Sequence, residues 1–288
     1  MKDKALFGPA GNCENFYATG HKSSLQIPKW LSDNNLYAYE YQCGKGVKIS
    51  EDSAVQLGKE AEKFGVTLSI HAPYYISLSS LEEEKRIKSV DYILKTLQAA
   101  KCMGAKRIVV HSGSCSKITR LEALNLAKDT LKKALIAADE AGFSEISICP
   151  ETMGKVNQLG NVAEVCELCK IDERLIPTVD FGHVNAQSLG GLKTISDFEK
   201  VFDTVLKTLG EYRVKNLHIH YSRIEYTNCG EKMHHTLSET EYEPEFDPIA
   251  EIIAARGYTP TIICESRGTQ TLDAKSMQKI YLDALKAV

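Results

Sequence analysis

The chain has 288 residues, of which 43% are hydrophobic and 25% are charged, and its formal net charge at pH 7 is −3. These proportions are those of an ordinary soluble globular protein, long enough to form one large α/β domain or two smaller ones. The charge excludes a generally basic surface, so a nucleic-acid partner would need a local basic patch.

Eight apolar runs of β-type composition recur in chain order, at residues 5–9, 36–42, 67–71, 107–111, 145–149, 176–180, 216–220 and 261–264. Between them lie segments with helical spacing, at residues 53–64, 81–103, 121–141, 162–170, 196–209, 248–255 and 274–287. Strands that alternate with helices form βαβ units and a parallel sheet. The continuous apolar character of the strands indicates burial on both faces of that sheet.

Eight strand–helix repeats in this length predict a single (β/α)8 TIM-barrel domain over residues 1–288. Gly65, Gly104, Gly142 and Gly257 each separate a helical pattern from the next strand, where a left-handed helix C-cap belongs. The alternative fold is a doubly wound open sheet. However, no G-x-G-x-x-G follows the first strand, as a dinucleotide site in such a sheet would require.

The sequence carries no pattern of export or membrane insertion. No stretch approaches the roughly 18 apolar residues of a membrane span, and residues 1–11 lack the apolar core of a signal peptide. The nine cysteines are an odd number without disulfide-framework spacing. We therefore expect reduced thiols, a cytoplasmic location and a monomer without a membrane partner. Cys166 and Cys169 form a C-x-x-C inside a helical pattern, where we expect no metal or redox role.

Histidines and acids stand at the carboxyl ends of six of the predicted strands. They are His71, His111, Glu151, Asp180, His218 and Glu265. In a closed parallel barrel these strand ends meet at one rim, where active sites lie. Imidazole and carboxylate groups are ligands that divalent cations such as zinc accept. The pattern therefore predicts a metal site at the C-terminal ends of the strands.

Each of these residues alone also has an ordinary explanation, as a hydrogen-bonded histidine or a surface ion pair. Together, so many ionisable groups in one mouth would repel one another or stay unsatisfied without a cation. A single catalytic zinc needs about three protein ligands. The larger set therefore indicates two or three ions with a carboxylate shared between two of them, an arrangement that suits phosphoester hydrolysis.

The order of motifs then resembles one family. The motifs are HAPYY at 71–75, VVHSG at 109–113, PETMG at 150–154, VDFGH at 179–183, HIHYS at 218–222, HH at 234–235 and ICES at 263–266. This order is similar to the endonuclease IV family of apurinic/apyrimidinic endonucleases, which belongs to the xylose isomerase-like barrels. The resemblance covers nearly the whole chain, and its most specific motif is the D-x-x-H of Asp180 and His183.

The resemblance implies three zinc sites and a hydrolase. The first site would use His71, His111 and Glu151. The second would share Glu151 and add Asp180, His218 and Glu265. The third would use His183 and His234 with an acid from the same loop. Glu151 and Glu265 are the expected catalytic residues. The cofactor would be two or three Zn²⁺ ions per chain, with Mn²⁺ as a possible substitute.

Two positions leave alternatives open. The family commonly has D-x-H in the third site, but here Lys232 stands in that register. One inserted residue would bring Glu231 into the role, 13 residues after His218. In the HIHYS motif, His218 and His220 face the same side because a strand repeats every two residues. The match to the family favours His218 as the ligand and leaves His220 to line the mouth. His235 and His21 are expected outside the ligand set, at the periphery or on the surface.

The resemblance also implies double-stranded DNA with abasic sites as the partner. Tyr74 and Tyr75, just after His71, would enter the minor groove where a nucleotide is extruded. The alternative is that both tyrosines only cover the barrel rim. Basic residues that follow strands on the same face could meet phosphates, namely Lys45, Lys48, Lys155 and Arg223.

The leading hypothesis is therefore a zinc-dependent endonuclease of base excision repair, cleaving the phosphodiester 5′ to an abasic site. The alternative is a sugar isomerase or epimerase on the same barrel, which generally needs one divalent ion bound mainly by carboxylates and a histidine. A third possibility is a barrel that binds a nucleic acid or sugar phosphate without catalysis. The number of bound ions distinguishes the first two.

Overall fold

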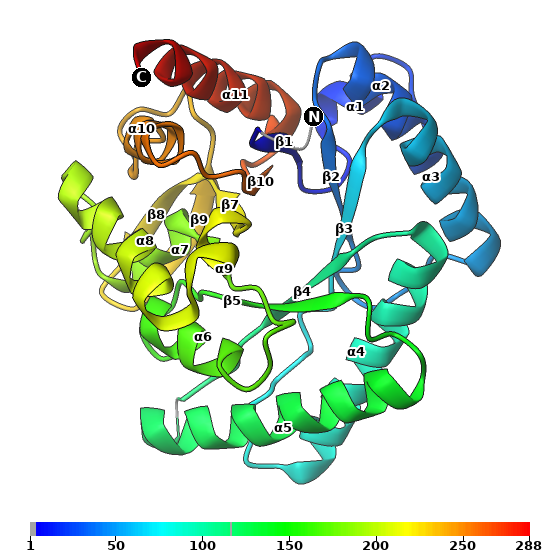
Figure 1. Cartoon of the computed structure of the whole chain (residues 1–288), viewed down its shortest axis with the longest axis vertical. Coiled ribbons are helices and arrows are strands. Elements are labelled where there is room, and N and C mark those ends of the chain that lie inside the picture. The colour runs from blue at the N-terminus through cyan, green and yellow to red at the C-terminus, as the bar shows by residue number, and fades with distance from the viewer. Residues whose placement is uncertain (1–3, 116) are drawn as a thin grey trace.

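The computed structural model describes residues 4–115 and 117–288. Its central sheet contains eight parallel strands (Figure 1), namely β1 Leu6–Pro9, β2 Ala38–Gln42, β3 Thr67–His71, β4 Arg107–His111, β5 Ser147–Glu151, β6 Thr178–Asp180, β7 His218–Tyr221 and β10 Thr261–Cys264. The strand order is β1-β10-β7-β6-β5-β4-β3-β2. Barrel strands that follow one another along the chain are therefore neighbours in the sheet, as predicted.

The sheet closes on itself between β1 and β2. Ala10 forms a parallel bridge with Glu40, and the Gly11 backbone N–H donates to the Glu40 carbonyl oxygen at 2.9 Å. Gly8 allows this approach, because a Cβ there would lie 1.6 Å from the Ala38 carbonyl oxygen. The predicted (β/α)8 barrel is confirmed, and the open doubly wound sheet is excluded.

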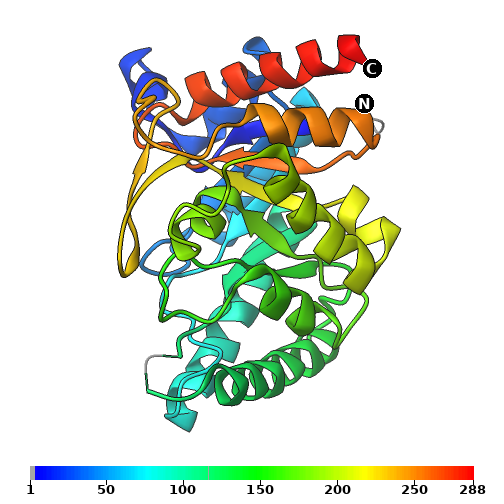
Figure 2. The same ribbon diagram turned by 90° about the vertical axis from the view of Figure 1, so that its left-hand side faces the viewer.

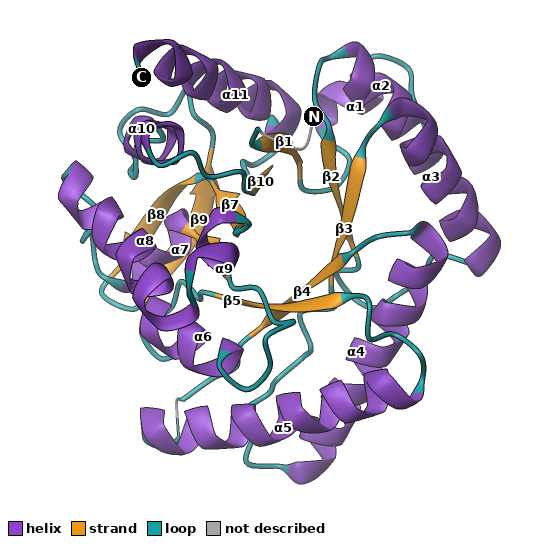
Figure 3. Cartoon of the chain, viewed as in Figure 1, coloured by secondary structure: helices purple, strands orange, loops and turns teal. Residues whose placement is uncertain are grey.

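Helices surround the barrel (Figures 2 and 3). Those longer than a single turn or two are α3 Glu51–Phe64, α4 Glu83–Met103, α5 Arg120–Glu140, α6 Val162–Cys169, α8 Ile195–Leu209, α10 Asp247–Ala255 and α11 Gln270–Ala287. Local sequence explains their ends. The Ser50 hydroxyl caps the start of α3, and Thr119 forms a capping box with Glu122 at the start of α5. Gly65 and Gly104, at φ +69° and +70°, end α3 and α4 as predicted.

Several short elements were not predicted from the sequence. Four of them are the helices α1 Glu14–Ala18, α2 Ile27–Asp33, α7 Phe181–Gln187 and α9 Glu211–Lys215. A 3-10 helix, η1 Ser24–Gln26, is a fifth. The strands β8 Arg223–Thr227 and β9 Gly230–His235 form an antiparallel hairpin outside the barrel (Figure 2). The region was predicted as a loop because the polar hairpin lacks an apolar run. In addition, β5 begins and ends two residues later than predicted, so Glu151 is its last residue.

The hydrophobic core lies mainly between strands and helices, whereas part of the barrel interior is polar. Glu40, Ser69, His218 and His220 are all buried, at 0–3% exposure. The nine cysteines are free thiols. None of the described helices combines the length and hydrophobicity needed to cross a membrane. These buried polar residues adjoin the rim at the carboxyl ends of the strands, where His220 contacts Glu151.

Candidate metal centre

Most of the side chains predicted to bind metal lie at the carboxyl ends of the barrel strands. His71, His111, Glu151 and Asp180 are the last residues of β3, β4, β5 and β6. Glu265 follows directly after β10. These strand ends open into a cavity of about 360 Å³, whose lining includes His71, His111, Glu151, His183, Glu231, His234 and Glu265. Barrel closure thus gathers residues that are up to 194 positions apart in the chain.

The buried Glu151 carboxylate faces histidines with both of its oxygens. Oε2 lies 3.3 Å from His71 Nε2 and 3.5 Å from His111 Nε2. Oε1 lies 3.1 Å from His220 Nδ1. His71, His111 and Glu151 place potential ligand atoms within 4.8 Å of one another. Because Glu151 also belongs to a second such group, its carboxylate can connect two ligand sets.

The second group contains Glu151, Asp180, His220 and Glu265, again with ligand atoms within 4.8 Å of one another. Asp180 Oδ1 caps α7 by accepting a hydrogen bond from the His183 backbone N–H at 2.8 Å. Asp180 Oδ2 is buried and has no hydrogen-bond partner among the described residues. A buried carboxylate oxygen that accepts no hydrogen bond, and lies 3.5 Å from His183 Nδ1 beside two further acids, is a position that a cation would satisfy.

His220, and not His218, belongs to this second group, which corrects the preference drawn from the sequence. Both side chains point into the barrel, but the strand register places His220 level with Asp180 and His218 level with Thr178. His218 therefore lies one layer deeper, where its Nε2 is 2.8 Å from Glu40 Oε2.

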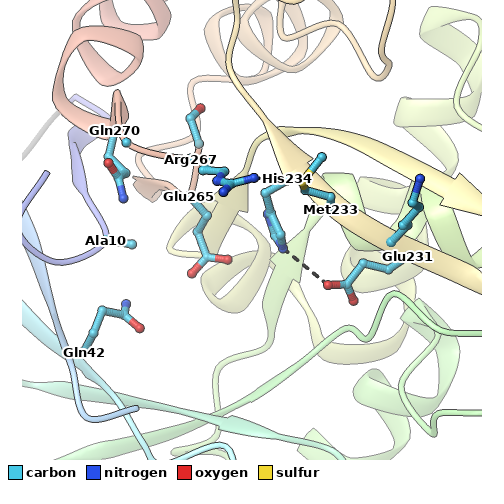
Figure 4. Close-up of a pocket in the computed structure, with 11 residues that line it drawn as sticks. Ala10, Gln42, Glu231, Met233, His234, Glu265, Arg267 and Gln270 are labelled. Atoms are coloured by element: carbon cyan, nitrogen blue, oxygen red, sulfur yellow. Dashed lines mark hydrogen bonds and ion pairs between the residues drawn. The ribbon is translucent and has the colours of Figure 1, made fainter. Parts of the chain in front are cut away.

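The third group contains His183, Glu231 and His234. Glu231 Oε2 lies 3.5 Å from His183 Nε2, and Oε1 lies 3.5 Å from His234 Nε2 (Figure 4). Lys232 is exposed and forms an ion pair with Glu225 of β8 at 2.6 Å. Of the two registers that the sequence left open, the structure therefore directs Glu231 toward the histidines.

Hydrogen bonds fix the orientation of three histidine rings. His71 Nδ1 lies 2.8 Å from the carbonyl oxygen of the next residue, and His183 Nδ1 lies 2.9 Å from the Thr152 carbonyl oxygen. His234 Nδ1 lies 2.8 Å from the Ser222 hydroxyl. In each ring the other nitrogen, Nε2, is left to face the acids. Anchoring of one nitrogen in this way is typical of histidines that bind metal through the other.

Opposing effects set the protonation of these histidines. Burial disfavours the charged form, but the Glu151 carboxylate outweighs it and raises the pKa of His71 to about 9. Burial is likewise outweighed at His183, where Asp180 and Glu231 raise the pKa to about 10. At His111 burial prevails and lowers the pKa to about 4. Burial also raises the pKa of Glu265, and the nearby Glu151 and Asp180 carboxylates act in the same direction.

Glu40 is a buried acid near this centre that the sequence analysis missed. Its carboxylate accepts hydrogen bonds from the Ser69 hydroxyl at 2.9 Å and from His218 Nε2 at 2.8 Å. It also lies 3.0 Å from His220 Nε2. Glu40, His218 and His220 form a further group with ligand-type atoms close together. A charged residue inside the apolar run at 36–42 was the sequence signal that could have identified it.

A neighbouring cavity of about 520 Å³ extends the site toward β1 and α11. It shares Gln42, Glu231, His234 and Glu265 with the first cavity. Arg267 and Gln270, which the sequence analysis did not select, also line it (Figure 4). The Arg267 guanidinium is directed toward His234 in this view and contacts the Met233 sulfur at 3.1 Å. This cavity therefore offers the Arg267 guanidinium and two amides beside the acid–histidine groups.

Tyr74 and Tyr75 lie in the loop after β3, beside the first cavity. Each side chain is 47% exposed, and their ring centroids are 4.5 Å apart. Tyr74 lines the cavity together with Lys155, and Lys155 is exposed. Lys45 and Lys48 are also exposed. The geometry thus permits both a contact with a ligand and the alternative rim-covering role.

Arg223 does not face this surface, so its prediction as a phosphate contact is wrong. Its side chain is buried and donates hydrogen bonds to the carbonyl oxygens of Leu237 and Tyr242. It also pairs with Glu245 at 2.6 Å. Arg223 therefore ties the segment after the hairpin to β8.

The remaining histidines and the C-x-x-C pair lie outside the three groups. His235 is buried, stacks on Tyr242 with ring centroids 3.6 Å apart, and bonds Glu239 at 2.8 Å. His21 stacks on Phe16. The C-x-x-C cysteines are buried on α6, where burial raises the pKa of Cys166 to about 12 and keeps it a thiol.

Among curated proteins, the chain is similar to an uncharacterised archaeal protein and to proteins named probable endonuclease 4. It is 32% identical over 247 residues to an uncharacterised protein of Methanocaldococcus jannaschii, covering 86% of this chain and 88% of that protein. It is 30% identical over 180 residues to a protein of Malacoplasma penetrans named probable endonuclease 4, covering 60% of each chain.

Solved structures of two kinds share the fold. Endonuclease IV from Thermus thermophilus superimposes with a TM-score of 0.70 at 17% identity, over 99% of this chain and 100% of that chain. A D-tagatose 3-epimerase-like protein also gives a TM-score of 0.70, at 21% identity, over 90% of this chain and 92% of that chain. The sequence profile described as "Xylose isomerase-like TIM barrel" matches residues 29–287. The chain therefore belongs to the xylose isomerase-like TIM barrel family, and endonuclease 4 proteins are among its relatives.

Proposed function

We propose that this protein is a zinc-dependent endonuclease that hydrolyses the DNA phosphodiester 5′ to an abasic site. The observation that carries the proposal is the pair of ligand groups joined through the two oxygens of Glu151, with a third group beside them. A shared carboxylate between adjacent cations is an arrangement suited to phosphoester hydrolysis. The resemblance to endonuclease IV and the name of the Malacoplasma penetrans relative supply the DNA substrate.

The residues fit divalent cations on chemical grounds. His71, His111 and Glu151 would hold one ion, and Glu151, Asp180, His220 and Glu265 a second. His183, Glu231 and His234 would hold a third. Imidazole nitrogens and carboxylate oxygens are ligands that zinc accepts, and Asp180 Oδ2, which accepts no hydrogen bond, is available as such a ligand. Bound cations would supply Lewis-acid activation of the phosphodiester and of the attacking water.

The chain's own residues then position the substrate. The two adjoining cavities share Glu231, His234 and Glu265, so a sugar–phosphate at the centre would also reach the second cavity. There the exposed Arg267 and the amide of Gln42 can bond phosphate oxygens. Glu151 and Glu265 line the first cavity and would help to orient the reacting groups as well as bind metal. The burial that raises the pKa of Glu265 would also limit water in the site.

The exposed tyrosines would contact the DNA around the extruded nucleotide. Tyr74 lines the cavity, and the Tyr75 ring packs against the Tyr74 ring. The pair therefore presents an aromatic surface at the mouth of the cavity. Aromatic insertion compensates for part of the few kcal/mol that extrusion costs. Lys45, Lys48 and Lys155 would meet phosphates from the same rim.

A sugar epimerase is the second candidate, and two observations favour it. Glu151, Asp180, His220 and Glu265 supply three carboxylates and one imidazole, which is sufficient for a single divalent ion. The epimerase-like structure also matches as well in fold as the endonuclease. The histidine-rich first and third groups have no function in a single-ion site, and for that reason we favour the nuclease.

Nicking of DNA is the direct test. We expect the zinc-loaded protein to nick a duplex that contains one abasic site, 5′ to that site, and a chelator to abolish the reaction. The matched control is an intact duplex of the same sequence, which should stay uncut. His111→Ala should abolish nicking without unfolding the barrel, because the His111 side chain is 25% exposed at the rim and lies outside the hydrophobic core. Epimerisation of a ketohexose with one bound Mn²⁺, and no nicking, would reverse the assignment.

The shared carboxylate makes a prediction about metal content. Glu151→Gln should lower the zinc content by two ions per chain, because Glu151 belongs to two groups. Glu231→Gln should lower it by one, because Glu231 belongs only to the third. Elemental analysis of dialysed protein measures both. Equal losses from the two variants would contradict the shared position of Glu151. Glu225→Gln, at a partly buried acid that pairs with Lys232 outside the three groups, serves as a control that should keep all ions.

Metal affinity should rise with pH. Below pH values of about 9 and 10, His71 and His183 of the metal-free protein hold a proton. A metal ligand must be a neutral imidazole, so binding releases these protons. The apparent zinc affinity should therefore increase by roughly tenfold per pH unit for each proton released. Competition titrations with a chromogenic chelator between pH 6.5 and 8.5 measure this increase. An affinity that is constant over this range would refute the protonation assigned to these rings.

The tyrosines can be tested separately from the metal. Tyr74→Ala should weaken binding of abasic duplex by roughly tenfold through loss of base or sugar stacking, with the zinc content unchanged. Tyr74→Phe should retain most of the affinity. Tyr212→Ala, at a 71% exposed tyrosine of α9, is the control for loss of a surface ring. Wild-type DNA affinity in both Tyr74→Ala and Tyr75→Ala would support the rim-covering role instead.

A further inference from the structure

A buried polar network lies directly beneath the candidate metal centre. The Glu40 side chain is fully buried, and so are those of His218 and His220. Ser69 and His218 donate to Glu40 Oε2, and the Gln42 amide donates to Oε1 at 3.3 Å. No lysine or arginine of the described residues pairs with this carboxylate. A buried carboxylate without such a partner is costly unless a nearby cation offsets its charge.

His220 connects this network to the rim. Its Nδ1 lies 3.1 Å from Glu151 Oε1 and 3.4 Å from Glu265 Oε1. Its Nε2 lies 3.0 Å from Glu40 Oε1 and is buried without an aligned hydrogen-bond partner among the described residues. The Nδ1 edge of the imidazole ring therefore lies against the proposed ligand group, and the Nε2 edge lies against Glu40.

The other rings show why this contact matters. His71, His183 and His234 each use Nδ1 to contact a carbonyl or hydroxyl oxygen, which leaves Nε2 free for the acids. His220 is reversed, because its Nδ1 faces the acids and its Nε2 points inward. A ring that binds metal through Nδ1 carries its proton on Nε2 and needs an acceptor there. Glu40 Oε1, which lies 3.0 Å from His220 Nε2, is close enough to accept that proton.

We propose that Glu40 is a positioning residue, which holds the proton of His220 on Nε2 and so directs Nδ1 to the ion of the second group. Glu40 does not itself touch the substrate or the proposed ion. An ion bound at His220 would offset the negative charge of Glu40. The inference rests on the metal binding of the proposed function, but not on the DNA substrate.

Two other roles for Glu40 make different predictions. If Glu40, His218 and His220 formed a metal site of their own, the chain would bind an additional ion in the barrel interior. If Glu40 only stabilised the fold, its removal would lower stability without a selective effect on one ion. Ion-by-ion affinities separate these roles from positioning of His220.

The test compares the full chain with its Glu40→Gln variant, which keeps the side-chain volume but removes the charge. Zinc dissociation constants come from competition with a chromogenic chelator, and cobalt absorption spectra report the ligand geometry. We expect one ion to bind about 10- to 100-fold more weakly, with the others unchanged and a change in the cobalt spectrum. Glu164→Gln is the matched control. Glu164 is also a buried acid, on α6, and it pairs with Arg120 of α5 at 2.6 Å. It should lose stability but keep every affinity.

Folded Glu40→Gln protein that binds all ions as tightly as wild type would overturn the inference. If the variant does not fold, a crystal structure of the zinc-loaded wild type decides. Zinc on His220 Nδ1, with Nε2 bonded to Glu40, supports positioning; zinc on Nε2, or between Glu40 and His218, overturns it. Nicking assays on the same samples keep the two proposals distinct. Wild type that binds zinc but does not nick abasic DNA would contradict only the proposed function.

Discussion

The position of the Glu151 carboxylate is the constraint on which the site depends. The strand register places Glu151 level with His111 on β4 and with Thr178 on β6. One oxygen therefore reaches the histidines of β3 and β4, while the other reaches His220 on β7. A buried acid with imidazoles on both sides can bridge the barrel mouth only because the sheet is closed. An open sheet would leave β3 and β7 too far apart to share one carboxylate.

The parts of this arrangement that depend on local sequence could be predicted. Apolar runs identified all eight barrel strands, and His71, His111 and Asp180 end their strands as expected. A residue at the carboxyl end of a parallel barrel strand must lie at the common rim, so the sequence position alone was sufficient. The helix ends at Gly65 and Gly104 were also predictable, because a left-handed C-cap depends only on the local sequence.

The parts that depend on depth or on pairing between segments could not be predicted. His218 and His220 share one face of β7, and only the register with β6 shows that His220 is level with Asp180. Glu231 and Lys232 alternate on β9, and their directions depend on a hairpin with an irregular register near Glu225. Glu40 escaped notice because its partners, Ser69 and His218, come from strands that are distant in the sequence.

The distribution of histidines is the strongest physical argument about the reaction. A single-ion site would be complete with Glu151, Asp180, His220 and Glu265, and would give no function to the rings at the mouth. Yet His71, His183 and His234 each have one nitrogen fixed by a hydrogen bond and the other directed at an acid. Ordering a side chain in this way costs conformational entropy, and with protonated rings it also places charges in a buried site. Cations bound between these rings and Glu151 or Glu231 would replace the protons and account for the arrangement. Several cations at one mouth, as we propose, would match a substrate with concentrated negative charge, which a phosphodiester has and a neutral sugar does not.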